Sequence, residues 1–368
     1  MGVLVNCFAV LFQLKLRLTF TIVALLGLTI SSTVLAAGES CLQSLKNTSP
    51  NQVRASVVRL EDRELSMMAW NVNNLFERRG EFLGDKKGSK NKEIKPEHEI
   101  KRVRDEIALH MPDFGVFTEV ENVAAMRRLL EEDPRLKGQY HVFLKNGNDA
   151  RGIDICLVVK KDLGLKFKFD TYKSLQLKDQ GEEGPLFSRD LPVLRIYQEG
   201  DLVPSLIIMG NHAKSQRDRE GDPNSSRWRS AQYKAIAEIS DKYESQYPGV
   251  PQILAGDFNI NVNLSAEINP IRKKFESVYN LVPEDQQIPV SERITHWFFP
   301  FNGDPVKQQL DDIRVRGYLK ILQALIRPLK DRQDQELEEG PQSFKEREKL
   351  ASDHAPLVMK FRTAKKEN

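Results

Sequence analysis

The sequence predicts one large domain of the mixed α/β or α+β class, in which helices cover β-sheets, over residues 65–362. Short apolar runs of strand length recur along this region, and segments with helical spacing lie between them. No linker rich in proline, glycine or serine divides it. The chain has 368 residues, of which 40% are hydrophobic and 29% are charged. This composition supports a packed core and excludes a disordered, collagen-like or polytopic membrane protein.

Seven runs have the length and apolar character of buried strands. They occupy residues 65–72, 114–118, 153–159, 193–197, 206–211, 252–255 and 356–361. Two other segments have helical spacing. Ile100, Val103 and Ile107 recur at helical intervals behind Pro96, and residues 228–243 repeat the pattern. The alternation of the two kinds of segment predicts sheets that are covered by amphipathic helices.

The first 36 residues have the features of an export signal. Lys15 and Arg17 precede a stretch without charges over residues 18–38, which ends in small residues around Ala36. We expect a signal peptide at residues 1–36, cleaved after Ala36. The same stretch is long enough to span a bilayer, so an uncleaved membrane anchor is the alternative. The small and hydroxyl-bearing residues at its end favour removal, which predicts a secreted or periplasmic protein without stable membrane association.

The segments that flank the domain are short and polar. Residues 37–64 are weakly patterned and are expected to form a lead-in, and residues 363–368 form a polar tail. Cys41 and Cys156 remain after the predicted cleavage, and in an exported chain they permit one disulfide. Cys156 lies in the apolar run 155–159, which favours a buried free thiol.

The net charge provides no general attraction for polyanions. The chain has 55 Lys and Arg against 52 Asp and Glu, and removal of Lys15 and Arg17 with the signal leaves 53 against 52. Affinity for nucleic acid must therefore come from local basic clusters and from metal-bridged phosphate. Residues 77–104 hold ten Lys and Arg against six Asp and Glu, and residues 213–229 hold five against three. Both segments suit a phosphate backbone, and both equally suit an ordinary solvated loop.

Polar side chains gather at the ends of the predicted strands. They are Asn71, Asn73, Glu119, Asn211, His212, Asp257, Asn259, Asp311, Asp312, Asp353 and His354. One such residue is usually a turn former or a helix cap. The whole set indicates a catalytic site, because a sheet fixes the geometry of such groups while its loop side stays open to substrate. Carboxylates and amides with two histidines and no cysteine suit Mg²⁺ or Mn²⁺ rather than structural zinc.

Six motifs carry these residues in order. They are Trp70-Asn71-Val72-Asn73, Thr118-Glu119-Val120, Asn211-His212-Ala213-Lys214-Ser215, Gly256-Asp257-Phe258-Asn259, Leu310-Asp311-Asp312-Ile313 and Ser352-Asp353-His354-Ala355-Pro356. Over residues 65–362 they resemble the motifs of the endonuclease/exonuclease/phosphatase superfamily, in particular its bacterial exported nucleases. The resemblance implies a two-layer β-sandwich flanked by helices, which is the four-layer DNase I-like architecture. It also implies Mg²⁺-dependent cleavage of phosphate esters.

The resemblance implies a set of metal ligands. Glu119 resembles the principal metal-binding carboxylate of the family, with Asn71 beside it and Asp353 contributing from the last strand. The implied ion is Mg²⁺, with Mn²⁺ as a substitute. Some relatives carry Asp at the position of Asn73, and a neutral amide would weaken a metal contact there. Asn73 is therefore left out of the expected ligand set.

The resemblance also implies catalytic roles at five positions. Asp257 resembles the residue that orients or deprotonates the attacking water, and Asn259 its neighbour that holds phosphate or a second metal. His354 resembles the histidine that contacts the scissile phosphate, and Asp311 the carboxylate that orients this imidazole. His212 matches the histidine that stands near the leaving oxygen in the DNase I and sphingomyelinase branches.

Two further residues have open interpretations. Arg189 precedes an apolar strand and resembles an arginine near the substrate phosphate in bacterial members, but an exposed cation at a strand edge would have the same sequence. Asp154 would either face the site and partner His212 or pair with Arg151. Residues 295–301 form an aromatic cluster that suits either stacking on a base or packing in the core.

We therefore expect an exported, Mg²⁺-dependent nuclease with weak sequence selectivity, acting on DNA or RNA as a monomer. A phosphodiester is anionic, so its hydrolysis needs positive charge on the nonbridging oxygens, an aligned nucleophile and a proton or metal for the leaving oxygen. A phosphoesterase of lipid or inositol head groups is disfavoured, because the Pro-x-Trp-x-Asp-Arg segment of inositol 5-phosphatases is replaced around Asp311. A non-catalytic binding module on this fold is disfavoured, because every key acidic and histidine position is filled.

Overall fold

The computed structural model describes residues 59–363, apart from residues 78–79, 82–90, 180–181 and 301–303. The predicted signal peptide, Cys41 and most of the predicted lead-in lie outside the described residues. Among the helices of the described part, none has the length and apolar character needed to cross a membrane.

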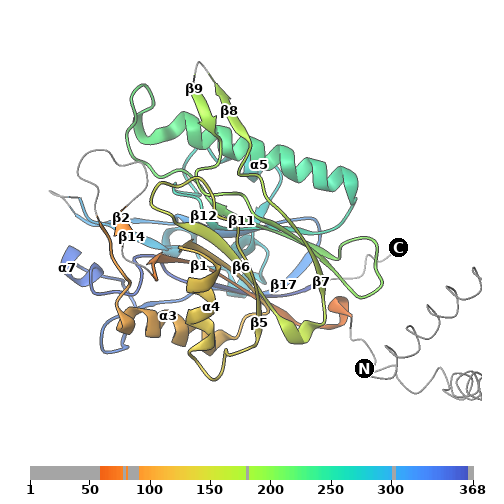
Figure 1. Cartoon of the computed structure of the whole chain (residues 1–368), viewed down its shortest axis with the longest axis horizontal. Helices are drawn as coiled ribbons and strands as arrows, with labels where there is room; N and C mark the ends of the chain where they lie inside the picture. Colours follow the sequence, from red (N-terminus) through yellow and green to blue (C-terminus); the bar gives the residue numbers. More distant parts are fainter. Residues whose placement is uncertain (1–58, 78–79, 82–90, 180–181, 301–303, 364–368) are drawn as a thin grey trace, which may run out of the picture. The chain divides into compact units, whose positions relative to one another are not determined.

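Two six-stranded mixed sheets form the centre of the described chain (Figure 1). The first has the order β17 (Leu319–Ile326), β20 (Leu357–Thr363), β1 (Leu65–Leu75), β4 (Phe114–Val120), β6 (Asp154–Lys160) and β5 (Tyr140–Phe143). The second has the order β13 (Glu276–Ser277), β16 (Asp311–Arg316), β12 (Gln252–Asp257), β11 (Leu206–His212), β10 (Val193–Tyr197) and β7 (Lys166–Asp170). The neighbours β1 and β4 are parallel, as are β11 and β12, and the other neighbours are antiparallel.

The remaining elements are helices and short two-stranded sheets. The helices are α3 (Glu97–His110), α4 (Val123–Glu131), α5 (Ser226–Gln246), α6 (Asn269–Arg272) and α7 (Phe344–Arg347). Short 3₁₀ turns are η1 (Leu60–Asp62), η2 (Lys161–Leu163), η3 (Pro223–Ser225), η4 (Val278–Asn280), η5 (Glu284–Gln286) and η6 (Val290–Glu292). The short strands pair as β2 (Gly80–Glu81) with β3 (Asn91–Lys92), β8 (Gln176–Asp179) with β9 (Glu182–Pro185), β14 (His296–Phe298) with β15 (Val306–Gln308), and β18 (Leu329–Lys330) with β19 (Glu336–Leu337).

Alternating side chains of the central strands separate the layers. On β1, Met67 lies in the core between the two sheets, and Met68 lies in the cluster that contains the apolar faces of α3 and α4. On β12, Ile253 lies between the sheets and Leu254 packs in the cluster with α5. Full burial of one such side chain stabilises the fold by about 1.5–3 kcal/mol. The result is two sheets face to face with helices on both outer faces (Figure 1), so the predicted four-layer fold class is confirmed.

The predicted strands correspond to β1, β4, β6, β10, β11, β12 and β20, and the predicted helices to α3 and α5. The packed part of the chain begins earlier than the predicted residue 65. Leu60 is 2% exposed, lies in the core between the sheets, and donates its backbone N–H to Gln198 Oε1. Cys156 is buried and free, as the apolar run predicts.

Gly256 occupies a position that only glycine fits. Its φ is +132°, and an added Cβ would overlap the carbonyl oxygen of Asn211 on the neighbouring strand. We expect Gly256→Ala to reduce the free energy of unfolding by about 3 kcal/mol or more, because backbone strain and the clash add. Urea unfolding would measure this loss.

Gly164→Ala is a matched control. Gly164 also has positive φ, at +64°, but no atom lies within 4 Å of an added Cβ. The control should therefore lose only the backbone term of about 1 kcal/mol. Equal losses in the two variants would contradict the close approach of β11 and β12 at Gly256.

Candidate active site

Strand ends that bear polar residues meet at one edge of the two sheets. In the second sheet, His212 at the end of β11 is in register with Asp257 on β12, and Asp257 is in register with Asp311 on β16. In the first sheet, β1 and β4 run parallel, with Asn71 near the end of one and Glu119 near the end of the other. The two pairs of parallel strands therefore deliver these residues to a common edge.

Asp257 is the centre of the cluster and is 1% exposed. Its Oδ2 accepts hydrogen bonds from Asn71 Nδ2 at 3.1 Å and from Asn259 Nδ2 at 3.2 Å. Its Oδ1 accepts the backbone N–H of Asn259 at 2.7 Å. The same Oδ2 lies 3.5 Å from His212 Nε2 and 4.0 Å from His354 Nε2. One carboxylate thus connects both sheets and two imidazoles.

The surroundings of Asp257 change its proton affinity. Burial raises its pKa to about 7, and the nearby Asp311 carboxylate acts in the same direction, while the charge of His354 opposes the shift. A carboxyl group with such a pKa can exchange a proton near neutral pH, as a general base requires.

His354 and Asp311 form a buried pair. His354 Nδ1 lies 2.7 Å from Asp311 Oδ2. Burial opposes a charge on His354, but the carboxylates of Asp311 and Asp257 outweigh it and raise the pKa of His354 to about 10. The ring is therefore held as an imidazolium at neutral pH, with Nε2–H turned away from Asp311 toward the centre of the cluster.

His212 is a neutral imidazole in this arrangement. Burial lowers the pKa of His212 well below its ordinary value, and the positive charges of Arg189 and Arg151 lower it further. Its Nε2 lies 3.9 Å from Glu119 Oε1, which places it between Glu119 and Asp257. The pKa values of the two histidines are thus shifted in opposite directions, because His354 has a carboxylate within hydrogen-bonding distance, that of Asp311 at 2.7 Å, whereas the nearest carboxylate oxygen to His212 is 3.5 Å away.

The backbone turns sharply where the metal-ligand candidates lie. Asn73, Asn74, Glu119 and Asn259 all have left-handed φ angles, between +48° and +64°. Asparagine adopts this region readily, whereas glutamate does so rarely. The backbone N–H of Asn74 donates to Glu119 Oε2 at 3.0 Å. This bond joins the ends of β1 and β4, and strained backbone of this kind is concentrated at functional sites.

Asp353 lies beside a histidine that the sequence analysis did not assign to the site. His296 Nε2 is 3.6 Å from Asp353 Oδ2, and the His296 ring lies 4.6 Å from the His354 ring. Burial opposes ionisation of Asp353, but contact with His296 and the charge of His354 lower the pKa of Asp353 below its ordinary value. Trp297, the next residue along, packs in a core cluster. Within the described part of the aromatic run, residues 295–300, Trp297 thus packs in the core and His296 lies at the site.

Arg189 and Asp154 are both buried, and neither has the partner that the sequence suggested. Arg189 is 3% exposed, and it forms an ion pair with Asp149 at 2.9 Å and donates to the Ala213 carbonyl at 3.0 Å. It is therefore not an exposed cation at a strand edge. Asp154 accepts the backbone N–H of Gly147, and burial raises the pKa of Asp154 to about 7. Direct contact of Arg189 or Asp154 with a substrate phosphate stays a prediction. The burial of both side chains does not favour such a contact.

Asp149 forms ion pairs with both Arg189 and Arg151. The expected alternative that Asp154 pairs with Arg151 is therefore wrong. Arg151 Nε lies 3.3 Å from Asp149 Oδ1, so the acid that pairs with Arg151 is Asp149. Among the described residues, no hydrogen bond or ion pair joins Asp154 to His212.

Lys95 ties two segments of the site together. Its ammonium donates to the Asn73 carbonyl at 2.9 Å and to the Ala351 carbonyl at 2.6 Å, and it forms an ion pair with Glu99 at 3.1 Å. Burial lowers the pKa of Lys95, and the charge of Glu99 opposes this shift. The sequence placed Lys95 in a basic loop, but its bonds to the segment before His354 are structural.

The oxygen donors at this edge fit a hard divalent cation. Glu119 Oε1 accepts no hydrogen bond from the described residues, and Asn71 Oδ1 accepts one, from the Asn73 backbone, which leaves it a second lone pair. Among the described residues, two sets of three side chains have possible ligand atoms that lie within 4.8 Å of one another inside each set. The first set is His296, Asp353 and His354. The second is Asp257, Asp311 and His354. Neither group includes Glu119, which is linked to Asp257 through His212.

Solved structures with the same fold come from animals and bacteria. Truncated TDP2 of Caenorhabditis elegans is 18% identical and covers 83% of this chain and 100% of its own length, with a TM-score of 0.53. D. rerio TDP2 complexed with a single-strand DNA product is 17% identical, covers 82% and 100%, and has a TM-score of 0.52. An endonuclease/exonuclease/phosphatase from Bacteroides vulgatus is 14% identical, covers 82% and 99%, and also has a TM-score of 0.52. At these identities the likeness is one of fold.

The sequence itself matches a family model. Residues 67–282 match the model of the endonuclease/exonuclease/phosphatase family. The match covers more than half of the chain and includes Asn71, Glu119, His212 and Asp257. Curated proteins give no match. The chain therefore belongs to the endonuclease/exonuclease/phosphatase family, whose members generally hydrolyse phosphoester bonds and typically use divalent metal ions.

Proposed function

We propose that the chain is a divalent-metal-dependent phosphodiesterase that hydrolyses nucleic acid with weak sequence preference. The observation that carries this proposal is the position of Asp257. It lies between a neutral imidazole, His212, and an imidazolium, His354, at the sheet edge that also bears Glu119. A base, a cation and a neutral hydrogen-bond donor around one point match what hydrolysis of an anionic diester requires.

Glu119 is the proposed principal metal ligand, and Asn71 and Asp353 would complete the ligand set. Mg²⁺ or Mn²⁺, when bound, would supply positive charge to the nonbridging oxygens of the substrate phosphate. The oxygen-only donor set suits these ions. The hydrogen bond from the Asn74 backbone fixes the Glu119 carboxylate by one oxygen and leaves the other available.

The protein residues divide the remaining work. His354 Nε2–H would donate to a phosphate oxygen, and Asp311 holds its ring in place and charged. Asp257 would orient the attacking water and accept its proton, because its pKa lies near neutrality. Neutral His212 would hydrogen-bond to the leaving oxygen.

Asn259 positions this base. Its amide donates to Asp257 Oδ2 and to the Ala213 carbonyl, and its backbone N–H donates to Asp257 Oδ1. We therefore propose that Asn259 holds the Asp257 carboxylate rather than phosphate or a second metal.

A nucleic acid substrate is supported by a relative and by one partly exposed cluster. D. rerio TDP2 has been crystallised with a single-strand DNA product. In the basic segment 213–229, the Arg219 guanidinium lies 4.2 Å from the centre of the Trp228 ring, and Lys214 Nζ lies 5.1 Å from it. Arg229 in the same segment is buried against Glu267, so only part of this basic charge is available to a ligand.

We also propose that the mature protein is secreted or periplasmic and acts as a monomer. The support for export is the charge and hydropathy pattern of residues 1–36. Edman sequencing of the mature protein recovered from the native host would test it. An N-terminus near Ala37 is expected, and retention of residues 18–38 would favour the membrane anchor.

Metal removal tests the proposed activity. The purified mature chain should nick supercoiled plasmid DNA in Mg²⁺ or Mn²⁺, and EDTA should stop the reaction because the substrate charge is no longer neutralised. Gel electrophoresis of the plasmid forms measures this result. RNA, sphingomyelin and an inositol polyphosphate are run in parallel.

The outcomes separate the candidate functions. Hydrolysis of sphingomyelin or of the inositol polyphosphate without DNA or RNA cleavage would replace the nuclease with a head-group phosphoesterase. Plasmid binding without hydrolysis of any substrate would favour a non-catalytic binding module. Cleavage that continues in EDTA would contradict the metal requirement.

A further inference from the structure

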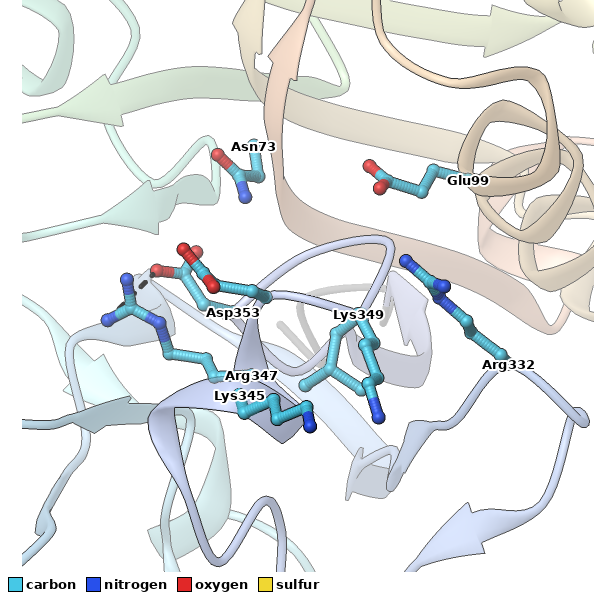
Figure 2. Close-up of a pocket in the computed structure, with 9 residues that line it drawn as sticks. Asn73, Glu99, Arg332, Lys345, Arg347, Lys349 and Asp353 are labelled. Atoms are coloured by element: carbon cyan, nitrogen blue, oxygen red, sulfur yellow. Dashed lines mark ion pairs between the residues drawn. The ribbon is translucent and has the colours of Figure 1, made fainter.

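A basic depression of about 530 Å³ opens beside the candidate active site (Figure 2). Its lining includes Arg332, Lys345, Arg347 and Lys349, which belong to the segment that precedes the last strand. We call it the basic pocket. The sequence analysis did not single out this segment, since its cations alternate with acidic residues.

The basic pocket is continuous with the active site. Asn73 and Asp353 also line it. Asn73 is two residues from the site residue Asn71, and Asp353 directly precedes His354 in the chain. Figure 2 shows the Asp353 carboxylate close to the Arg347 guanidinium, and their closest N···O distance is 3.8 Å. A group in the pocket would therefore lie next to a phosphate that His354 holds.

The pocket has uncompensated positive charge. Glu99 on its wall is paired with the buried Lys95 at 3.1 Å, and Asp353 balances Arg347. The side chains of Arg332, Lys345 and Lys349 make no hydrogen bond or ion pair with any described residue.

Among the acidic residues that line the pocket, Glu99 pairs with Lys95 and Asp353 with Arg347, so Glu348 is the remaining carboxylate. Three free cations against one free carboxylate favour an anionic ligand. Their long side chains can adjust to a phosphate without breaking existing contacts.

We infer that the basic pocket is a second phosphate-binding subsite, which holds a backbone phosphate of the nucleic acid strand adjacent to the scissile one. This inference rests on the proposed function. A nucleic acid strand has phosphates at regular intervals. When His354 contacts the scissile phosphate, a neighbouring phosphate of the same strand can therefore lie in the basic pocket. A diester with a single phosphate would leave the pocket empty.

Binding of a labelled strand tests the subsite separately from catalysis. The triple variant Arg332→Gln, Lys345→Gln, Lys349→Gln is compared with a matched triple, Lys137→Gln, Lys234→Gln, Lys320→Gln, which has the same charge change at exposed positions on other elements. Both are made in an Asp257→Asn background to prevent turnover. Fluorescence anisotropy measures the Kd of a fluorescein-labelled ten-nucleotide DNA strand in Ca²⁺ at several salt concentrations.

The pocket triple should raise the Kd by about tenfold or more, and the slope of log Kd against log salt should fall by about 0.7, as expected when one phosphate of a single strand is no longer neutralised. The matched triple should stay within about twofold of the Asp257→Asn parent. Circular dichroism melts check that both triples are folded.

Equal Kd values for the two triples, or no strand binding by the parent, would overturn the subsite. A pocket-dependent Kd for inositol hexakisphosphate together with an unchanged Kd for DNA would overturn it in favour of a head-group ligand. A Kd for DNA that rises in the pocket triple and not in the matched triple would support the subsite. If the chain with Asp257 intact then hydrolyses no nucleic acid, the proposed activity fails and the subsite stands.

Discussion

Asp257→Asn is expected to lower kcat for DNA cleavage by about 10³-fold or more, with a much smaller change in KM. The amide cannot accept the proton of the attacking water, and removal of a general base or of preorganised charge typically costs 10²–10⁴-fold. The substitution keeps the size of the side chain. An amide oxygen in place of Oδ2 still accepts from Asn71 and Asn259 Nδ2, whereas the amide nitrogen cannot accept the Asn259 backbone N–H. Steady-state cleavage of a labelled oligonucleotide in saturating Mg²⁺ measures both parameters.

The control for this variant is Asp241→Asn. Asp241 is a partly exposed carboxylate that pairs with Arg316 and Lys274 away from the strand ends of the site. It should retain cleavage within about twofold, since surface ion pairs contribute little to stability. A folded Asp257→Asn enzyme with more than a tenth of the parent kcat would remove Asp257 from the catalytic step.

The second large effect is expected at the two histidines. His354→Ala and His212→Ala should each lower the rate by about 10² or more, because each removes a donor close to Asp257. The two variants should differ in stability. His354→Ala leaves the Asp311 carboxylate buried without its partner, whereas His212 has no comparable ion pair and its Nδ1 has no hydrogen-bond partner within the described residues.

His354→Gln separates the two effects at that position. Glutamine retains a neutral donor but not the charge, so it should recover part of the lost stability and little of the rate. Activity, measured as cleavage of the same oligonucleotide, and melting temperature are compared for all three variants. Unchanged cleavage in both alanine variants would refute the assignment of the site.

The sequence was sufficient where a strand is buried on both faces. The runs at β1, β4, β6, β11 and β12 are continuous and apolar because each packs against the other sheet on one face and a helix on the other. Strands β5, β7, β16 and β17 were not predicted. Many residues of β5, β7 and β17 are only partly buried, and in the buried strand β16 charged residues interrupt the apolar run. A half-exposed strand at or near a sheet edge carries a weaker hydrophobic pattern.

The site was predictable where polar residues follow such strands, and not where loops supply them. Asp257 and His212 could be predicted to share a site because each ends a buried strand and belongs to a motif of the resembling family. The structure places them in register on two parallel strands. His296 comes from the short strand β14, which pairs with His354 only through an isolated bridge. The position of His296 next to Asp353 results from tertiary contacts, which the local sequence pattern does not predict.

Charge in the loops was the least predictable feature. Lys95 and Arg229 belong to segments that look like solvated basic loops, yet both are buried and bonded to carbonyls. The three free cations of the basic pocket lie within residues 332–349, which hold six Asp and Glu against four Lys and Arg. Whether a charged side chain is paired or free depends on its neighbours in space, which composition alone does not give.

Anomalous diffraction from crystals soaked in Mn²⁺ would locate the ion on which the proposed chemistry depends. We predict one strong anomalous peak within about 2.1 Å of Glu119 Oε1, next to Asn71 and on the side of the cluster that faces Asp257. A peak bound instead by His296, Asp353 and His354, with none at Glu119, would contradict the proposed ligand set. Manganese found only at sites remote from Asp257 would contradict the metal-dependent mechanism itself.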